Sequence, residues 1–364
     1  MMRAMGACLL GMLLLVMLPA QAEYRVETVV DGLEHPWSLA FLGDGVMLVT
    51  ERPGRLRVVE NGVLRDTPVE GVPDVFASGQ SGLFEVLPAP DFARSGVLFL
   101  SYVHGDRNAN HTRIVRARFD GQRLTDVQPI FTTRPSKSGD AHAGGRLLLL
   151  PDGTLLMGLG DGFFFREESQ KLDSHMGTIV RIHTDGRIPA DNPFVGRAGA
   201  LPEIYSYGHR HIQGLVYDAG RERIFAHEHG PRGGDELNII TPGTNYGWPL
   251  VSFGRDYSRA LITPFTRMTG MEQPVLHWTP SIAPAGLALY EGDAFPGWRG
   301  NLLVAALAEK SLRRIPMAGG QPGAQEVLLE DLGERIRDVR VGPDGAIYVL
   351  TDEENGRLLR LTPD

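Results

Sequence analysis

LLLLPDGTLLMGLGD, residues 147–161, is the stretch from which the fold can be worked out. Its two apolar runs have the length of β-strands, and the Pro-Asp-Gly between them has the residues that tight hairpin turns prefer. A third strand, GTIVRI at residues 177–182, follows and completes a small antiparallel meander. Such a sheet leaves an apolar face exposed unless another sheet packs against it, so the stretch predicts a unit that repeats.

The same pattern occurs six times along the chain. The six copies begin roughly 47 to 72 residues apart and hold the segments 39–59, 86–119, 147–182, 215–230, 287–317 and 339–363. Repeats of this length that each form a small antiparallel sheet predict an all-β fold, a six-bladed β-propeller of four-stranded antiparallel blades. Two stacked β-sandwich domains are the alternative architecture.

The first strand and the insertions lead to further expectations. Residues 24–29, YRVETV, can pair with the sixth copy and close the ring. Copies four and five carry long insertions, which we expect to be loops on the functional face. We therefore expect residues 23–364 to form a single propeller domain.

The first 22 residues have the features of a secretory signal peptide. Arg3 precedes an apolar stretch that ends near residue 20 and is too short to span a bilayer, and Ala20-Gln21-Ala22 is a small-residue cleavage site. A buried N-terminal helix is the alternative. Cleavage would remove Cys8, the one cysteine of the chain, and with it any disulfide, thiol catalysis or cysteine metal site. We expect a periplasmic or secreted protein with no stable membrane insertion.

Composition and charge exclude several classes of protein. Gly (45) and Pro (25) together make up about 19 % of the 364 residues, against about 12 % on average, which excludes a helical bundle or coiled coil. The 42 % of hydrophobic residues and 22 % of charged residues argue against disorder. A formal charge of −8 without a basic run argues against nucleic-acid binding.

Four polar segments between the strands hold residues that a turn does not require. In the first, His142 stands before Gly144-Gly145, where a ligand or a backbone segment can approach closely. Asp161, at the end of the following strand, could orient its imidazole. A surface-turn histidine is the alternative for this segment.

The second and fourth segments are rich in cationic side chains. Residues 205–214, YSYGHRHIQG, place two histidines and an arginine before a strand, and a solvated loop is the alternative. Arg335 and Arg337 project to one face of a strand, where two guanidinium groups repel unless an anion such as a polycarboxylate or phosphate lies between them. A solvated strand edge is the alternative for this pair.

The third segment, HEHGPRGGDELN at residues 227–238, raises the question of a metal. Zinc is disfavoured, because strand alternation points His227 and His229 together while Glu228 faces away, and no third histidine has a suitable spacing. Calcium is the better candidate, since carbonyls of a Gly-Pro turn and the pair Asp235-Glu236 offer oxygen ligands. A salt-bridged turn is the alternative.

Taken together and in this order, these segments resemble the soluble pyrroloquinoline quinone (PQQ)-dependent sugar dehydrogenases, in particular the aldose sugar dehydrogenase branch. The resemblance runs from residue 32 to the C-terminus. It is carried by GHRH-IQG, EHGPRGGDELN, NYGWP, W-x-PSIAPAG and RIRDV, five collinear pieces on a six-repeat chain. The family's fold is a six-bladed propeller, which agrees with the repeat count.

The resemblance implies catalytic roles for three residues. His142 corresponds to the general base that removes the proton of the C1 hydroxyl group as hydride passes to PQQ, and Asp161 would hold its imidazole. Arg210 would lie beside the quinone oxygens and stabilise negative charge there. Trp278 resembles an aromatic wall of the substrate mouth.

The resemblance also implies binding residues for PQQ and Ca²⁺. The residues that match cofactor contacts are Gln80, Arg210, His211, Arg335 and Arg337. Carbonyl oxygens of Gly230 and Pro231 would bind the calcium that polarises the cofactor. Glu236 and the backbone carbonyl of Tyr246 resemble ligands of a second, structural calcium.

The chain departs from the family pattern at several positions. His211 stands where the family usually has Asn, and Ala141 replaces a polar residue before the base. Ala308 falls where glucose-specific enzymes carry a cofactor-binding lysine, with Lys310 a nearby substitute. Residues 162–165, Gly-Phe-Phe-Phe, place aromatic rings where a polar loop is common. These departures argue against glucose specificity.

The sequence thus favours an exported PQQ- and calcium-dependent dehydrogenase. It would oxidise a small-molecule aldose to a lactone and pass electrons to an unknown electron acceptor. A calcium-dependent propeller hydrolase of the lactonase kind is one alternative, and it would need several carboxylate or amide side chains around an axial metal. A non-catalytic propeller that binds carbohydrate or protein is the other, and it would not need His142, Arg210 and the arginine pair to converge.

Overall fold

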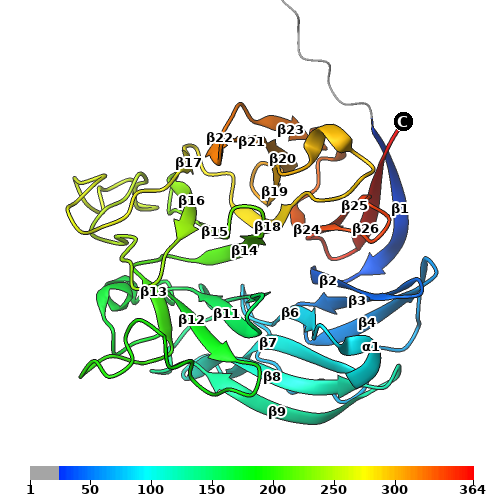
Figure 1. Cartoon of the computed structure of the whole chain (residues 1–364), viewed down its shortest axis with the longest axis horizontal. Helices are drawn as coiled ribbons and strands as arrows, with labels where there is room; N and C mark the ends of the chain where they lie inside the picture. The colour runs from blue at the N-terminus through cyan, green and yellow to red at the C-terminus, as the bar shows by residue number, and fades with distance from the viewer. Residues whose placement is uncertain (1–23) are drawn as a thin grey trace, which may run out of the picture.

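Each copy of the sequence pattern forms one four-stranded antiparallel sheet. A computed structural model describes residues 24–364, so the predicted signal peptide lies outside the described residues. Figure 1 shows the six sheets arranged in a ring, which confirms the predicted six-bladed propeller and excludes two stacked sandwiches.

The first three blades follow one another along the chain without a break in the order of their strands. The first blade consists of β2 Pro36–Gly43, β3 Val46–Glu51, β4 Arg55–Glu60 and β5 Val63–Leu64. The second consists of β6 Leu83–Pro88, β7 Val97–Gly105, β8 Asn110–Phe119 and β9 Leu124–Thr132. The third consists of β10 Gly144–Leu149, β11 Thr154–Leu159, β12 Thr178–His183 and β13 Ile204–Tyr207.

The last three blades complete the ring. The described chain also contains a two-stranded ribbon and four short helices, which are not part of the blade sheets. The fourth blade consists of β14 Ile212–Asp218, β15 Arg223–Glu228, β16 Asp235–Ile240 and β17 Leu276–Trp278. The fifth consists of β18 Pro284–Leu289, β19 Leu302–Ala306, β20 Ser311–Ile315 and β23 Glu326–Leu328. The sixth consists of β24 Ile336–Val341, β25 Ile347–Thr351, β26 Gly356–Pro363 and β1 Tyr24–Leu33. The remaining elements are the ribbon of β21 Met317–Ala318 and β22 Gln321–Pro322, α1 Phe92–Ser95, η1 Arg166–Gln170, η2 Pro296–Trp298 and η3 Glu330–Leu332.

The ring is closed by the two ends of the described chain. β1 pairs antiparallel with β26, with Tyr24 opposite Pro363 and Val26 opposite Leu361. Figure 1 shows these strands side by side. The sixth blade therefore contains strands from both ends of the sequence, as the pairing of residues 24–29 predicted.

The hydrophobic core lies between blades. Leu48 and Leu56 of the first blade pack in one buried cluster with Leu98 and Leu100 of the second, and similar clusters fill the other interfaces. Burying the apolar faces that single sheets would expose is the main favourable contribution to this arrangement.

The direction of the strands brings the polar segments to one end of the propeller. The first strand of each blade contacts the first strands of its two neighbours, around the axis. His142, His211 and Arg335 precede such inner strands, whereas Asp161 and His229 follow second strands. Because neighbouring strands are antiparallel, the start of an inner strand and the end of a second strand lie at the same end.

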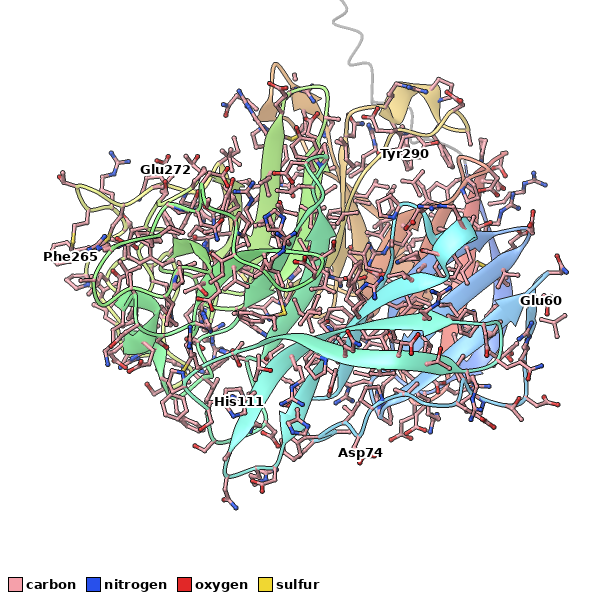
Figure 2. All side chains as sticks on the ribbon, turned by 60° about the horizontal axis from the view of Figure 1, so that its bottom comes forward. Glu60, Asp74, His111, Phe265, Glu272 and Tyr290 are labelled. Carbon is pink, nitrogen blue, oxygen red and sulfur yellow. The ribbon has the colours of Figure 1, made fainter. Side chains whose placement is uncertain are left out.

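The two long insertions lie in different places. The insertion of copy four, residues 241–275, carries Trp248 and Tyr257 to the functional face, as expected, and projects at the side where Figure 2 labels Phe265. The expectation for copy five is wrong. Its insertion, residues 290–301, joins β18 to β19 at the opposite end, where Tyr290 Oη donates to Gly345 O at 2.7 Å. The first hairpin of a blade always opens away from the start of its inner strand.

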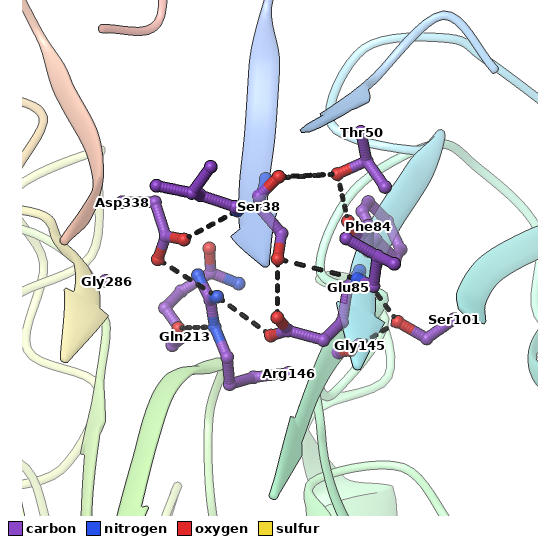
Figure 3. A network of polar contacts seen from close by, with 12 residues as sticks. Ser38, Thr50, Phe84, Glu85, Ser101, Gly145, Arg146, Gln213, Gly286 and Asp338 are labelled. Carbon is purple, nitrogen blue, oxygen red and sulfur yellow. Dashed lines mark hydrogen bonds and ion pairs between the residues drawn. The ribbon is translucent and has the colours of Figure 1, made fainter. Parts of the chain in front are cut away.

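A buried polar network fills the axis beneath the functional face (Figure 3). Arg146 of β10 donates to Glu85 of β6 at 2.8 Å, to Asp338 of β24 at 3.1 Å and to the carbonyl oxygen of Gln213 of β14 at 2.9 Å. Its guanidinium lies 4.2 Å from the ring centroid of Trp37. Among residues 24–364, no helix is long and apolar enough to cross a membrane.

Candidate active site

A cavity of about 840 Å³ opens at the functional end of the propeller axis. This volume lies in the range of small-molecule sites. Its lining includes four of the residues predicted to contact a cofactor, Gln80, His211, Arg335 and Arg337, and also Trp37, Arg52, Gln213, His229, Tyr257, Leu307 and Asp352. Strands and loops that are far apart in the sequence therefore meet at this cavity.

One side of the cavity is rich in arginine. Arg337 Nη2 donates to Asp352 Oδ2 at 2.5 Å, and Arg335 Nε lies 3.7 Å from the same oxygen. Burial raises the pKa of Asp352, but the two arginines outweigh it and hold that pKa well below its usual range. The anion expected between the two guanidinium groups is thus, in part, a carboxylate of the protein itself. Arg337 Nε stays buried without a hydrogen-bond partner in the described chain.

Arg52 is a third arginine of this side that the sequence analysis did not find. It lines the cavity, and its guanidinium donates to the carbonyl oxygen of Gly79. Burial lowers the pKa of Arg52, and the positive charges of Arg337 and Arg335 lower it further. In the sequence Arg52 is an ordinary residue between two strands, and no motif separates it from other arginines.

The backbone and ring of His142 are both fixed. The residue has a φ of 50°, in the left-handed region, and its N–H donates to Gln80 Oε1 at 3.0 Å. The ring nitrogen Nδ1 lies 2.7 Å from Asp161 Oδ1. Since a carboxylate only accepts, Nδ1 carries a proton and Nε2 is left as the basic nitrogen of the neutral ring.

Asp161 is itself held by two donors. Trp248 Nε1 donates to Asp161 Oδ2 at 2.8 Å, and the backbone N–H of Phe163 donates to Oδ1 at 2.8 Å. Burial raises the pKa of Asp161, but its hydrogen bond with His142 and its other contacts outweigh burial, and the pKa lies below its usual value. The carboxylate is therefore ionised and fixed in orientation. The predicted contact between His142 and Asp161 is present, and Trp248 is an addition from the insertion of copy four.

The imidazole of His142 is covered on two sides. His211 stacks on it at 4.4 Å with an interplanar angle of 15°, and the ring of Phe163 meets it edge-on at 5.0 Å. His142 is 2 % exposed and lines a recess of about 20 Å³ beside the main cavity. Burial lowers the pKa of His142, and the hydrogen bond with Asp161 raises it only in part. The ring is thus neutral near pH 7, the state that a general base needs.

Arg210 is buried beside this pair. Its Nη1 donates to the carbonyl oxygens of His229 at 3.0 Å and Gly230 at 2.7 Å, and its guanidinium lies 5.3 Å from the ring centroid of Trp248. It lines a second cleft of about 440 Å³ together with Asp161, Phe163 and Tyr257. A fixed cation therefore lies next to the proposed base and its carboxylate.

The histidines around Glu228 have structural partners. His227 Nε2 lies 3.3 Å from Gly286 O and His229 Nε2 lies 2.8 Å from Pro284 O, both on the next blade. Glu228 points the other way and contacts His209 Nδ1 at 3.0 Å. This alternation agrees with the argument against zinc. Among residues 24–364, no group of three or more His, Cys, Asp or Glu side chains could hold a metal ion.

The two halves of the Asp235-Glu236 pair differ. Asp235 accepts from the backbone N–H groups of Gly230, Ile282 and Ala283 and from Ser281 Oγ, so it fastens two loops together. It forms no salt-bridged turn within the described chain. Glu236, in contrast, is opposite Glu228 across the β15–β16 ladder.

Glu236, which is half-buried, and Glu228, which is buried, form a pair of neighbouring carboxylates. Asn238 Nδ2 donates to both, at 3.3 Å and 3.2 Å, while its own Oδ1 has no partner in the described chain. Burial raises the pKa of Glu236 well above its usual value, and the charge of Glu228 raises it further. This set of oxygen acceptors is chemically suited to a hard cation.

The Gly230-Pro231 turn is less suited to a cation as it stands. The Gly230 carbonyl oxygen already accepts from Arg210, and a guanidinium group at 2.7 Å repels a second positive charge. We therefore derive no chemical step from a metal at this turn.

Trp278 and Lys310 do not line the cavity. Trp278 is 5 % exposed in the hydrophobic core between the fourth and fifth blades, and its Nε1 donates to Gln325 Oε1 at 2.8 Å. The structure thus contradicts its placement at the substrate mouth, where Tyr257 lines the cavity instead. Lys310 donates to Gly333 O at 2.7 Å and is absent from the lining, so it does not replace the lysine missing at Ala308.

Comparison with known proteins agrees with this geometry. An aldose sugar dehydrogenase of Escherichia coli is 43 % identical over 350 residues, which cover 94 % of each chain. The apo crystal structure of the soluble E. coli aldose sugar dehydrogenase has a TM-score of 0.91 and 42 % identity, and the match covers 94 % of this chain and 100 % of that one.

A PQQ-bound aldose sugar dehydrogenase of Streptomyces coelicolor has a TM-score of 0.78 and 32 % identity, with 95 % of this chain and 99 % of that one covered. Residues 33–360 match the sequence profile of the Glucose / Sorbosone dehydrogenase family, which is nearly the whole described chain. The chain therefore belongs to the Glucose / Sorbosone dehydrogenase family.

Proposed function

We propose that this protein is an exported PQQ-dependent aldose sugar dehydrogenase, an oxidoreductase that oxidises an aldose at C1 and so converts the sugar to a lactone. The observation that carries the proposal is the hydrogen-bonded series Trp248, Asp161 and His142 beside an arginine-lined cavity, in a chain of this family. Such a series holds a neutral imidazole with Nε2 free to take a proton.

The cavity fits a small polycarboxylate such as PQQ. Arg52, Arg335 and Arg337 offer guanidinium groups along one side, where Asp352 contacts both Arg335 and Arg337; Glu353 and Glu354 also line the cavity. Within the described chain, Arg337 Nε and His211 Nδ1 have no hydrogen-bond partner, and both atoms are buried. Gln80, Arg335 and Arg337 would hold the cofactor, and bound PQQ would supply the acceptor for the hydride of C1.

The chain's own residues would then perform the proton transfer. His142 Nε2 would take the proton of the C1 hydroxyl group, and Asp161 would stabilise the imidazolium that forms. Arg210, fixed by two carbonyl oxygens, would stabilise negative charge that develops beside it. Phe163 and Tyr257, whose rings stack at 6.2 Å, would limit the access of water and position the sugar.

Two calcium sites are proposed, a structural site and a cofactor site, and more of the observed contacts support the structural one. Glu236 and the backbone carbonyl of Tyr246 would hold a structural Ca²⁺, because a cation would balance the adjacent carboxylates of Glu228 and Glu236 and would bind Asn238 Oδ1, which has no partner in the described chain. A cofactor-polarising Ca²⁺ on Gly230 and Pro231 stays a prediction from the family resemblance. Residues 1–22 would direct export to the periplasm and be removed.

The two alternative functions receive less support. A metal-dependent hydrolase would need free carboxylates near the axis, yet Glu85 and Asp338 are each paired with Arg146 and Arg340. A non-catalytic binding protein would have no use for an ionised, buried aspartate that orients a neutral histidine.

Reconstitution tests the proposal. Purified apoprotein is loaded with PQQ and Ca²⁺, and aldose-dependent reduction of an artificial dye is measured across a panel of sugars. We expect activity that depends on PQQ, and His142→Ala should remove most turnover while cofactor binding persists. His111→Ala is the matched control, because His111 lies on β8 with its Nδ1 near Thr133 O, away from the cavity. Absence of both sugar-dependent dye reduction and bound PQQ would contradict the proposal.

A further inference from the structure

Gln213, on β14, touches both the arginine side of the cavity and His211. Its Oε1 accepts from Arg337 Nη1 at 3.4 Å, and its Nε2 lies 3.0 Å from His211 Nε2 and 3.2 Å from Ile212 O. Its backbone carbonyl accepts from Arg146 in the axial network. Neither the repeat pattern nor the family comparison gives this glutamine a role.

The orientation of the Gln213 amide is fixed by two independent contacts. Arg337 can only donate, so the atom that faces it must be the amide oxygen. Ile212 O can only accept, so the atom that faces it must be the NH₂ group. The reverse orientation would place a donor against a donor and an acceptor against an acceptor.

This orientation determines which nitrogen of His211 carries the proton. The Gln213 NH₂ group can only donate, and therefore His211 Nε2 must be the unprotonated acceptor. The proton of the neutral ring then lies on Nδ1, which is buried and has no partner among residues 24–364.

The surroundings of His211 keep it neutral. Burial lowers its pKa well below the usual value, and His142, His229, Arg210 and Arg337 lower it further. The ring is stacked on His142, with the edge of His229 against it at 5.3 Å. A neutral ring with one bonded nitrogen presents a single fixed donor.

We propose that Gln213 is a positioning residue that holds His211, whose ring stacks on His142 beside the cavity, in the Nδ1–H tautomer. Nδ1 is buried, so it would donate to an acceptor atom of the bound cofactor once the side chains over it move aside, and this second part rests on the proposed function. Gln213 thereby lets an imidazole take the donor role of the amide that the family usually has at position 211. Arg337, Gln213 and His211 are coupled, because Arg337 fixes the orientation of the Gln213 amide and that amide fixes the tautomer of His211.

The tautomer is measured in apoprotein labelled with ¹⁵N-histidine, by two-bond ¹H–¹⁵N correlation spectra. His211→Asn assigns the signals of His211. In the wild type we expect a protonated Nδ1 and a bare Nε2 that do not change between pH 6 and pH 8. Gln213→Glu replaces the donor with an acceptor and should move the proton to Nε2. Gln325→Glu is the control, since Gln325 binds Trp278 Nε1 away from the cavity and should leave the His211 signals unchanged.

Binding of PQQ alone, measured by equilibrium dialysis without sugar, gives a second readout. We expect Gln213→Glu to weaken binding about tenfold more in the wild type than in His211→Asn, whose side chain has no tautomer. The charge that Glu introduces is common to both backgrounds and cancels.

Three outcomes would overturn the inference: a wild-type proton on Nε2, unchanged His211 signals in Gln213→Glu, or equal weakening of PQQ binding in the two backgrounds. If Gln213→Glu fails to fold, the wild-type spectrum and Gln213→Met, expected to show both tautomers, decide the matter. The expected tautomer in a protein that binds no PQQ would support the role of Gln213 and contradict the proposed function, so the two failures are distinguishable.

Discussion

At the scale of single residues, the site depends on a donor–acceptor series that runs from a tryptophan to a base. Trp248 donates to Asp161, and Asp161 accepts from His142 Nδ1, so each group fixes the next. The role of Asp161 is electrostatic as well as geometric, because its negative charge stabilises the imidazolium formed when His142 takes a proton.

Removing the charge of Asp161 should therefore reduce kcat far more than removing the hydrogen bond that Trp248 donates to it. Asp161→Asn keeps the shape, but its NH₂ group favours the wrong tautomer of His142, and we expect kcat to fall about 10²- to 10⁴-fold. Trp248→Phe removes one hydrogen bond to the carboxylate, and we expect a loss of about tenfold. Steady-state dye reduction by PQQ-loaded enzyme measures both. Equal losses of kcat in the two variants would contradict the larger role assigned to the charge of Asp161.

The pH dependence of activity should reflect the lowered pKa of His142. The base works when neutral, and burial moves its pKa down, so the acid limb of kcat/KM should lie below about pH 6.5. Asp161 raises this pKa and Lys137 lowers it. Asp161→Asn should then move the limb to lower pH, and Lys137→Met should move it to higher pH. Shifts in the same direction would show that another group titrates.

At the scale of elements, the β15–β16 ladder contains an unfavourable pair. Glu228, which is buried, and Glu236, which is half-buried, are directly opposite each other, and like charges in this position destabilise a sheet. The raised pKa of Glu236 means that the folded state binds a proton that the unfolded state has released. Stability is therefore present below the usual glutamate pKa and lost as the pH rises towards the raised pKa.

Glu236→Gln should stabilise the metal-free protein and abolish its response to calcium. Without metal at pH 7, we expect a gain of about 1–3 kcal/mol, since the variant no longer has to bury a second carboxylate. At a Ca²⁺ concentration of about 100 Kd, the wild type should gain about 2.7 kcal/mol and the variant much less. Thermal unfolding with EGTA and with CaCl₂ measures both effects. A variant that responds to calcium like the wild type would place the cation elsewhere.

The elements also show what the sequence could predict. Strands and hairpins were readable, because apolar runs and Pro-Asp-Gly turns are local signals. The convergence of His142, Asp161, His211 and the arginine pair was implied by the family resemblance, and the strand order now explains it, since each stands at the same end of a blade. Trp248 and Tyr257 were missed because they belong to an insertion without repeat, and the contact of Trp248 with Asp161 spans 87 residues. Trp278 was misplaced because an aromatic residue in a short strand serves a core equally well.

At the scale of the whole molecule, two features join the blades. β1 closes the ring by pairing with β26, and the axial network connects residues of five blades. Ser38, Glu85, Arg146, Gln213 and Asp338 belong to the first, second, third, fourth and sixth blades. Trp37 and Gln213 contact Arg146 from above and also line the cavity, so the network forms the floor of the proposed site.

The axial network balances two carboxylates with two guanidinium groups. Arg146 and Arg340 each contact both Glu85 and Asp338, so removing one cation leaves a buried negative charge without compensation. Breaking a buried ion pair in this way typically costs 3–5 kcal/mol. We expect that loss for Arg146→Met in denaturant unfolding. Glu85→Gln in the same chain restores the charge balance, so the double variant should lose clearly less than the sum of the single losses.

The control for this prediction is an ion pair of the surface. Arg123 and Glu70 are 56 % and 72 % exposed and lie 3.0 Å apart, and Arg123→Met should change stability by less than about 0.5 kcal/mol. If Arg146→Met cost no more than Arg123→Met, the axial network would contribute only packing. In that case the blades would be held by their apolar interfaces and by the pairing of β1 with β26, and the floor of the cavity would not depend on the charges beneath it.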